Sequence, residues 1–174
     1  PRLRNGNLDL AIMALPSEAT GMVDSPLYTE KFSIVCPPDH PIAGREDVEL
    51  AELKDLDLLL LDDGHCLRDQ VVDLCRHADI NPAEATNSVT RASSLTTIMQ
   101  LVMGGLGCTL VPESALATEC HGKDVAIAHF ASDVTAEREV GLVFRSSAAR
   151  AEEFREFGTL ITAACNKAIE RSRQ

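Results

Sequence analysis

The stretch LDLLLLDDGHCLRDQVVDLCRHA, residues 56–78, decides the fold class. It opens on an apolar run ending in four consecutive leucines, which is typical of a strand that is covered on both faces. The turn formers at residues 62–64 end this strand, and apolar residues at helical spacing then predict a helix over about residues 66–78. A strand, a tight turn and a helix in this order form the repeating unit of α/β proteins.

The same alternation continues on both sides of this stretch. Strands are predicted at residues 8–14, 27–37, 108–111, 125–130 and 140–144. Helices are predicted at residues 50–55, from a Ser93 or Ser94 cap to Met103, directly after Pro112, and at residues 151–171. The last helix is expected to bury an apolar stripe that includes Phe154, Phe157 and Ile161. Strands that alternate with helices predict an α/β fold with a mainly parallel sheet.

The composition of the 174 residues excludes several classes of protein. Apolar residues make up 45% of the chain, well above the level of disordered segments. The 16 basic and 27 acidic residues give a net charge of −11, which disfavours binding of nucleic acid by this chain itself. Apolar runs stay far below the roughly 20 residues that span a bilayer, and the first residues do not form a signal peptide, so no membrane partner is expected.

The cysteines indicate the redox compartment in which the chain is expected to work. There are six: Cys36, Cys66, Cys75, Cys108, Cys120 and Cys165. They show no CxxC pair and no zinc-finger spacing with histidine, so the sequence predicts neither a metal site nor another cofactor. A chain this rich in aliphatic residues needs no disulfide scaffold, and most of these cysteines are expected to be small buried residues in a reducing cytoplasm.

Cys66 and Cys75 form a more informative pair. Cys66 follows the carboxyl end of a predicted strand and falls in the first turn of a helix, where free N–H groups favour a thiolate. The carboxylates of Asp62, Asp63 and Asp69 disfavour it, so the sequence leaves the direction of the net pKa shift open. Nine residues of helix rise about 13 Å and turn by about 900°, so the two thiols face opposite sides. A disulfide requires Cα atoms within about 7 Å, so the two can join only if the helix unwinds. The residues alone leave two readings open, a redox switch or two ordinary core cysteines.

Three motifs show a resemblance to the effector-binding domains of LysR-type transcriptional regulators: LRNGNLDLAI at residues 3–12, HPIA at residues 40–43 and VMGGLGCTLVP at residues 102–112. The octapeptide DGHCLRDQ at residues 63–70, followed by Cys75, resembles the OxyR branch of that family, the hydrogen-peroxide sensors. The resemblance extends over nearly the whole chain.

The resemblance implies a role for each residue that matches the motif. Cys66 matches the cysteine that peroxide oxidises to a sulfenic acid, and Cys75 matches the resolving cysteine that then forms a reversible disulfide with it. The matching peroxide-binding positions are His65, Asp69 and Arg138, with Gln70 as a weaker candidate. The resemblance implies that the helix between the cysteines unwinds and that residues 66 to about 88 refold.

The family also implies an architecture and a set of partners. The expected fold is α/β with two lobes that resemble type 2 periplasmic binding proteins. Regulatory lobe I would comprise residues 1–28 and 135–174, with its N-terminal part missing, and residues 29–134 would form lobe II with the redox cysteines. The implied partners are hydrogen peroxide, further copies in a homodimer or homotetramer, DNA through an absent winged helix-turn-helix domain, and RNA polymerase.

Two other functions stay open. The chain could be a metabolite-binding LysR-type effector domain in which the cysteines are incidental. It could instead be a thiol peroxidase, since a Cys–His–Arg grouping also serves catalytic turnover with an external reductant.

Overall fold

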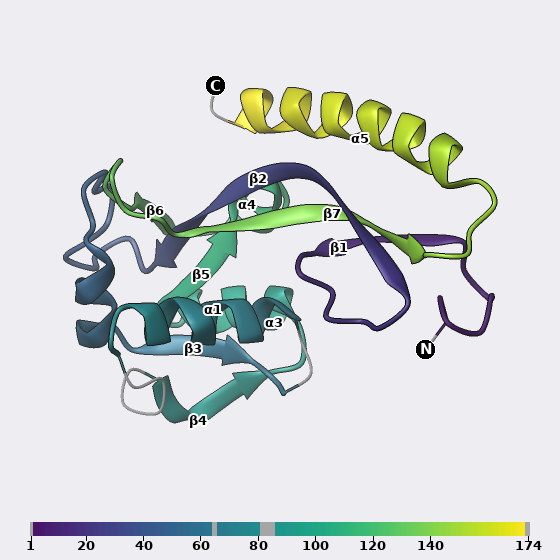
Figure 1. Ribbon diagram of the computed structural model, residues 1–174. Coiled ribbons are helices and arrows are strands. Elements are labelled where there is room, and N and C mark those ends of the chain that lie inside the picture. Colours follow the sequence, from purple (N-terminus) through teal and green to yellow (C-terminus); the bar gives the residue numbers. More distant parts are fainter. Residues whose placement is uncertain (1, 64–65, 81–85, 173–174) are drawn as a thin grey trace. The chain divides into compact units, whose positions relative to one another are not determined.

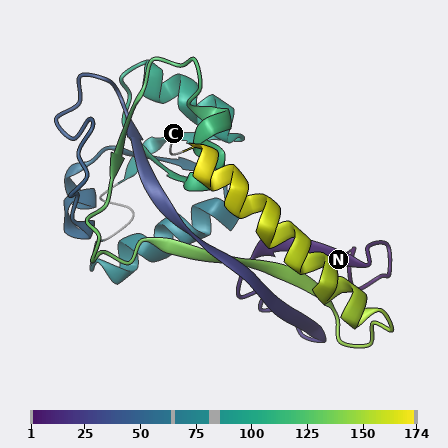
Figure 2. The same ribbon diagram turned by 90° about the horizontal axis from the view of Figure 1, so that it is seen from above.

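The computed structural model describes residues 2–63, 66–80 and 86–172 (Figures 1 and 2). The chain divides into two compact units, which are described separately. Unit 1 comprises the residues up to Glu30 and those from Glu137 onward, and unit 2 comprises Lys31–Ala136. These boundaries lie two residues after the expected ones at residues 28 and 135.

Unit 2 is built on strands of two sheets, which an isolated bridge between Leu58 and Cys108 connects. Its strands are the end of β2 (Met22–Cys36), β3 (Leu58–Leu61), β4 (Thr86–Ala92), β5 (Thr109–Pro112) and β6 (Ala126–His129). Strands β3 and β4 pair in parallel, whereas β5 and β6 each pair antiparallel with β2. The expectation of a mainly parallel sheet is therefore wrong where β2 is concerned. A buried apolar strand has the same residue pattern in either direction, so its sequence does not reveal the reversal.

Two separate cores cover the faces of these strands. On one face lie α1 (Cys66–His77) and the 3₁₀ helix η1 (Leu50–Asp55), and on the other lie α3 (Leu95–Met103) and α4 (Glu113–Glu119). We call the first the α1-side core; its members from α1 are Val71, Val72, Leu74 and Cys75. Along β3, Leu58 and Leu60 enter the α1-side core, whereas Leu59 and Leu61 enter the opposite one. The strand is thus covered on both faces, as its leucine run predicts.

The sequence also located the start of α3. Ser94 has an extended backbone, and its hydroxyl oxygen accepts a hydrogen bond from the Thr97 amide at 3.2 Å. The cap is therefore Ser94 and not Ser93. The apolar spacing of the sequence predicts a stripe of Leu95, Ile98, Met99 and Val102 on this helix. The last three are buried and Leu95 is half-buried, so helical periodicity and capping chemistry agree in placing the helix.

Unit 1 consists of a small sheet with one long helix along it. Strand β1 (Leu10–Ala14) pairs antiparallel with β7 (Glu137–Arg145), which is in turn a neighbour of β2. Helix α5 (Ala151–Ser172) packs on β7, and both views show it lying along that strand (Figures 1 and 2). Its main anchor is Phe154, whose ring meets Phe144 edge-on with ring centres 5.4 Å apart.

The predicted stripe of α5 is partly wrong. Phe154 is buried, but Phe157 remains 48% exposed. Gly158 explains the difference, because a Cβ atom at that position would lie 2.7 Å from the Leu27 side chain and 3.1 Å from Leu142. The helix therefore approaches the strands through its glycine, and Phe157 lies to one side of the contact. Among the described residues, no helix combines the length and the apolar composition needed to cross a membrane.

Candidate redox site

Cys66 is the first residue of α1, directly after the turn that follows β3, and its side chain is exposed. The preceding strand is held by its neighbour up to this turn, since the Asp62 amide donates to the Ala92 carbonyl at 3.0 Å. Amide groups in the first turn of a helix have no intrahelical acceptor and favour negative charge nearby. The fold thus presents an exposed thiol at the first position of a helix.

Cys75 lies near the other end of the same helix and has the opposite environment. Its side chain is 1% exposed and belongs to the α1-side core. Burial raises the pKa of the Cys75 thiol. Cys75 lies nine positions after Cys66, so their Cα atoms are about 13 Å apart along the helix axis, too far for a disulfide. Both thiols are free in this structure.

Arg68 organises the charges beside Cys66. One guanidinium nitrogen lies 2.8 Å from an Asp63 carboxylate oxygen, and another lies 3.7 Å from Asp69. Its Nε atom is buried and makes no hydrogen bond within the part of the chain that the structure describes. The first turn of α1 therefore combines a thiol, a cation and the Asp69 carboxylate, and Asp63, which precedes the helix, pairs with the same cation.

The other residues expected at the site divide into three groups. Asp69 is exposed and Gln70 is half-buried, and both follow Cys66 within the first two turns of α1. His65 lies outside the described residues. Arg138 belongs to β7 in unit 1, whereas Cys66 belongs to unit 2. The structure thus brings Cys66, Asp69 and Gln70 to one end of a helix.

Arg138 has a partner that the sequence did not indicate. Its Nε and Nη2 atoms donate to one carboxylate oxygen of Glu30 at 2.8 and 2.6 Å, and the Glu30 side chain is fully buried. Glu30 shares the inward face of β2 with Phe32, two residues further on. The sequence signal for this ion pair is a glutamate on the buried face of a strand, because a buried carboxylate requires a cation as its partner.

The hydrogen-bonded pair of Tyr28 and Cys165 is a second contact that the sequence pattern does not predict. Burial raises the pKa of Tyr28, and a hydrogen bond with Cys165 and the nearby Glu30 carboxylate raise it further. Tyr28 thus lies near the Glu30–Arg138 ion pair in unit 1. The polar cluster therefore joins β2, β7 and α5 within that unit.

The remaining cysteines have mixed environments. Cys36 and Cys108 are fully buried, Cys120 and Cys165 are half-buried, and all carry free thiols. Among the described residues, no group of three or more His, Cys, Asp or Glu side chains is arranged to hold a metal ion.

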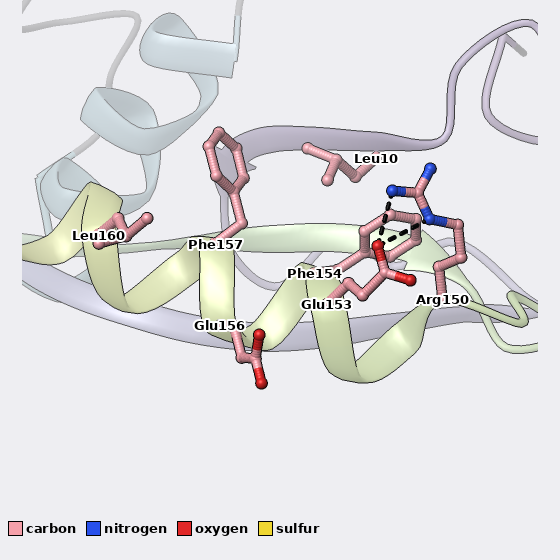
Figure 3. Close-up of a pocket in the computed structure, with 7 residues that line it drawn as sticks. All are labelled: Leu10, Arg150, Glu153, Phe154, Glu156, Phe157 and Leu160. Atoms are coloured by element: carbon pink, nitrogen blue, oxygen red, sulfur yellow. Dashed lines mark hydrogen bonds and ion pairs between the residues drawn. The ribbon is translucent and has the colours of Figure 1, made fainter.

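Unit 1 also carries an open groove, without a cysteine, between β1 and α5. Figure 3 shows its lining of Leu10, Arg150, Glu153, Phe154, Glu156, Phe157 and Leu160. Arg150 lies at one end and donates to Glu153 at 3.0 and 2.7 Å. The groove contains few polar groups that converge on one point, so it does not have the character of a small polar ligand site.

Comparison with known proteins places this arrangement in a family. The model of the LysR substrate binding domain matches residues 1–166. A probable hydrogen peroxide-inducible genes activator from Mycobacterium avium is 48% identical over 159 residues, which cover 91% of this chain and 50% of that protein. The chain spans about half the length of the curated relatives it matches.

Two solved structures of OxyR from Corynebacterium glutamicum are similar in fold and sequence. A Cys-to-Ser mutant with H₂O₂ bound has a TM-score of 0.95 at 59% identity, and the match covers 99% of this chain and 53% of that one. The oxidized form has a TM-score of 0.84 at the same identity and coverage. The matched motifs, the strand–turn–helix with its exposed cysteine and the likeness to these structures agree: the chain belongs to the LysR substrate binding domain family.

Proposed function

We propose that this chain is the hydrogen-peroxide-sensing regulatory part of a LysR-type transcriptional regulator, with Cys66 and Cys75 as its redox pair. The observation that carries the proposal is the placement of the pair, one thiol exposed at the start of α1 and the other buried nine residues later. The names of the relatives and the H₂O₂-bound and oxidized structures of a relative support it.

The first chemical step takes place at Cys66. Its thiolate attacks one peroxide oxygen, the O–O bond breaks, and the leaving hydroxide takes up a proton to become water. Cys66 becomes a sulfenic acid, oxidised by two electrons. The free amide groups in the first turn of a helix stabilise negative charge nearby, which suits the hydroxide that leaves. The Arg68 guanidinium pairs with the carboxylates of Asp63 and Asp69 and so offsets their negative charge.

The second step requires α1 to open. The Cys75 thiol attacks the sulfenic sulfur, water leaves, and an S–S bond replaces the S–O bond. Cys75 reaches Cys66 only if it leaves the core and the intervening helix unwinds. Oxidation thereby changes the packing of α1, which is the type of two-state element that a regulator needs.

Four further residues are assigned to binding of peroxide. His65 and Arg138 would donate hydrogen bonds to the peroxide and to the departing hydroxide. Asp69 would accept the peroxide proton or orient its neighbours, and Gln70 is a weaker candidate for contact with the peroxide. Since Arg138 is ion-paired with the buried Glu30, its guanidinium is held in a fixed direction, which suits an anchoring role.

The remaining parts of the proposal concern the whole regulator. Refolding of the segment from Cys66 to about residue 88 would alter an interface between copies in a dimer or tetramer. DNA binding would then change through a winged helix-turn-helix domain in another part of the protein, with RNA polymerase as a downstream contact. The site of action would be the cytoplasm, where the DNA is, and the protein would act once per oxidation and not as a turnover enzyme.

Peptide mapping by mass spectrometry tests the proposal. The chain is treated with about one equivalent of H₂O₂, and a Cys66–Cys75 linkage is expected that dithiothreitol reverses. Cys66→Ser should abolish this linkage, whereas Cys120→Ser, which changes a half-buried cysteine elsewhere, should retain it.

Two further measurements, of peroxide consumption and of the melting temperature, separate the alternative functions. Catalytic consumption of peroxide with thioredoxin or glutathione would show a thiol peroxidase instead. Free thiols after treatment, together with a small acid that raises the melting temperature, would show a metabolite-binding domain with incidental cysteines.

A further inference from the structure

Cys36 and Cys108 lie directly across from each other on neighbouring strands. Cys36 ends β2, and Cys108 immediately precedes β5. In the antiparallel ladder Val35 is opposite Thr109, so the next opposed pair is Cys36 and Cys108. Both side chains are fully buried members of the α1-side core, which places them on the same face of the sheet.

The ladder also fixes the type of this pair. Pro112 is opposite Phe32, and proline has no amide hydrogen, so this pair is not hydrogen-bonded. Pairs of the two types alternate, so the position four residues along, Cys36 opposite Cys108, is of the same type. The backbone hydrogen bonds of Cys108 support this assignment. Its amide donates to the Asp57 carbonyl, and its carbonyl accepts from the Leu59 amide, both at 2.8 Å. Both groups therefore point toward β3 and away from β2.

This geometry permits a disulfide. Opposed residues in non-hydrogen-bonded pairs have Cα atoms about 4.5 Å apart, and disulfides span Cα distances of about 4.4–6.8 Å. The pair stands at the short end of that range, where strain makes a disulfide easy to reduce. Unlike Cys66 and Cys75, these two cysteines could join without unwinding a helix. The Cys36 thiol, which donates to the Ala126 carbonyl at 3.7 Å, would turn away from that carbonyl.

Access is the barrier to their oxidation. Burial raises the pKa of both thiols, and the proximity of Cys36 raises that of Cys108 further, so little thiolate exists in the folded state. Part of the cover on this face comes from α1, whose Val71, Leu74 and Cys75 belong to the same core. Movement of α1 therefore removes packing from the face on which both thiols lie.

We propose that Cys36 and Cys108 are a second redox pair, which forms a cross-strand disulfide once oxidation of Cys66 and Cys75 has displaced α1. This rests on the proposed function for its trigger. Hydrogen peroxide is the oxidant: one thiol is oxidised to a sulfenic acid with release of water, and the other displaces a second water to form the S–S bond. The protein would then hold two disulfides of different origin, one that refolds a helix and one that joins β2 to β5 across the sheet.

The consequence is an ordered response to peroxide. A low dose oxidises only the accessible cysteine and its partner. A higher dose reaches the second pair while α1 is displaced, and the cross-strand disulfide keeps the exposed sheet face from being oxidised beyond the disulfide level.

The test is a peptide map of the full chain over a series of H₂O₂ doses, with the wild type, Cys66→Ser and Cys36→Ala compared. In the wild type the Cys66–Cys75 linkage is expected first and the Cys36–Cys108 linkage at higher doses. In Cys66→Ser the yield of Cys36–Cys108 is expected to fall at least tenfold, because α1 stays in place. Cys36→Ala should lose only the second linkage, which verifies the assignment of the peptides.

Three outcomes overturn the inference, and they differ from failure of the proposed function. If Cys66–Cys75 forms but Cys36 and Cys108 remain thiols at every dose, the second pair is refuted while the sensor stands. An equal yield of Cys36–Cys108 in Cys66→Ser would refute the order of events. If neither linkage forms with H₂O₂, the chain is treated with diamide in mild urea, which loosens the packing over the two thiols. A Cys36–Cys108 linkage in that reaction would support the second pair and refute only the proposed trigger. Absence of the linkage would refute the second pair.

Discussion

Cys66 and Cys75 share one helix, yet Cys66 is exposed at its first position and Cys75 is 1% exposed in the core. The half-turn difference between positions nine residues apart produces this contrast. An accessible thiol can meet peroxide, whereas a buried one is protected until the helix opens. Under the proposed function, we therefore expect the stability of α1 to control the second oxidation step and to leave the first unaffected.

Leu74→Ala is expected to accelerate formation of the Cys66–Cys75 disulfide. Leu74 is a buried member of the α1-side core, and its truncation should destabilise the packed helix by about 2 kcal/mol or more. Since about 1.4 kcal/mol corresponds to a factor of ten, the disulfide should form roughly tenfold faster or more. Trapping of the sulfenic acid with dimedone should show an unchanged first step. Arg76→Ala, on the exposed side of α1, is the control, and equal acceleration by both variants would contradict the argument.

Stability is expected to fall above about pH 8.5, the ordinary pKa of cysteine. Burial raises the pKa of four thiols, Cys36, Cys75, Cys108 and Cys120. As the pH rises, these thiols lose their protons in the unfolded chain before they do so in the folded chain. Deprotonation therefore stabilises the unfolded state, and the free energy of unfolding falls as the pH rises from the unfolded pKa toward the folded pKa. Urea denaturation between pH 7 and pH 10 measures the effect. Cys108→Ala should give a shallower decline, and a decline as steep as that of the wild type would contradict the assignment to buried thiols.

Much of this fold follows from short-range patterns. The leucine run of β3, the Ser94 cap of α3 and the helix from Cys66 were each placed by periodicity and turn chemistry. The direction of β2 was not, because pairing depends on residues distant in the sequence. Phe157 was misplaced for a similar reason, since the approach of Gly158 to Leu27 joins residues 131 positions apart.

In the candidate site, too, local sequence predicts some features and not others. The positions of Cys66 and Cys75 on opposite sides of one helix follow from local geometry. The pairing of Arg138 with Glu30 does not, since the two lie 108 residues apart and the neighbours of Arg138 in the sequence are also glutamates. The opposition of Cys36 and Cys108 likewise depends on the strand register and appears only in the folded chain.

Arg138→Ala is expected to destabilise the chain by about 3 kcal/mol, because it leaves the buried Glu30 carboxylate without its main cation. The double variant Glu30→Leu/Arg138→Leu should recover most of this loss, since it removes both charges. Chemical denaturation of the single and double variants measures the coupling. If the single variant is as stable as the wild type, the ion pair is not a structural element of unit 1.

Phe154→Ala and Phe157→Ala should differ sharply although they lie three residues apart on α5. Phe154 is buried against Phe144, and its truncation should lower the free energy of unfolding by about 3 kcal/mol or more. Phe157 is half-exposed beside the groove of Figure 3, and its truncation should cost less than about 1 kcal/mol. Thermal denaturation of the two variants compares them directly. Equal losses would mean that the exposed face of α5 is covered in solution.

Gly107→Ala is expected to disrupt the start of β5. Gly107 has a φ of +150°, and a Cβ atom there would lie 2.2 Å from the Asp57 carbonyl oxygen, which accepts the Cys108 amide. The strained backbone alone costs about 1–3 kcal/mol, and the clash adds to it by pushing β5 away from β3. Gly105→Ala is the matched control, because φ is also positive there but nothing lies within 4 Å of the added atom, so only about 1–2 kcal/mol should be lost. Urea denaturation measures both variants. Since Gly107 also sets the position of Cys108 opposite Cys36, Gly107→Ala should lower the yield of the Cys36–Cys108 disulfide, whereas Gly105→Ala should leave it unchanged.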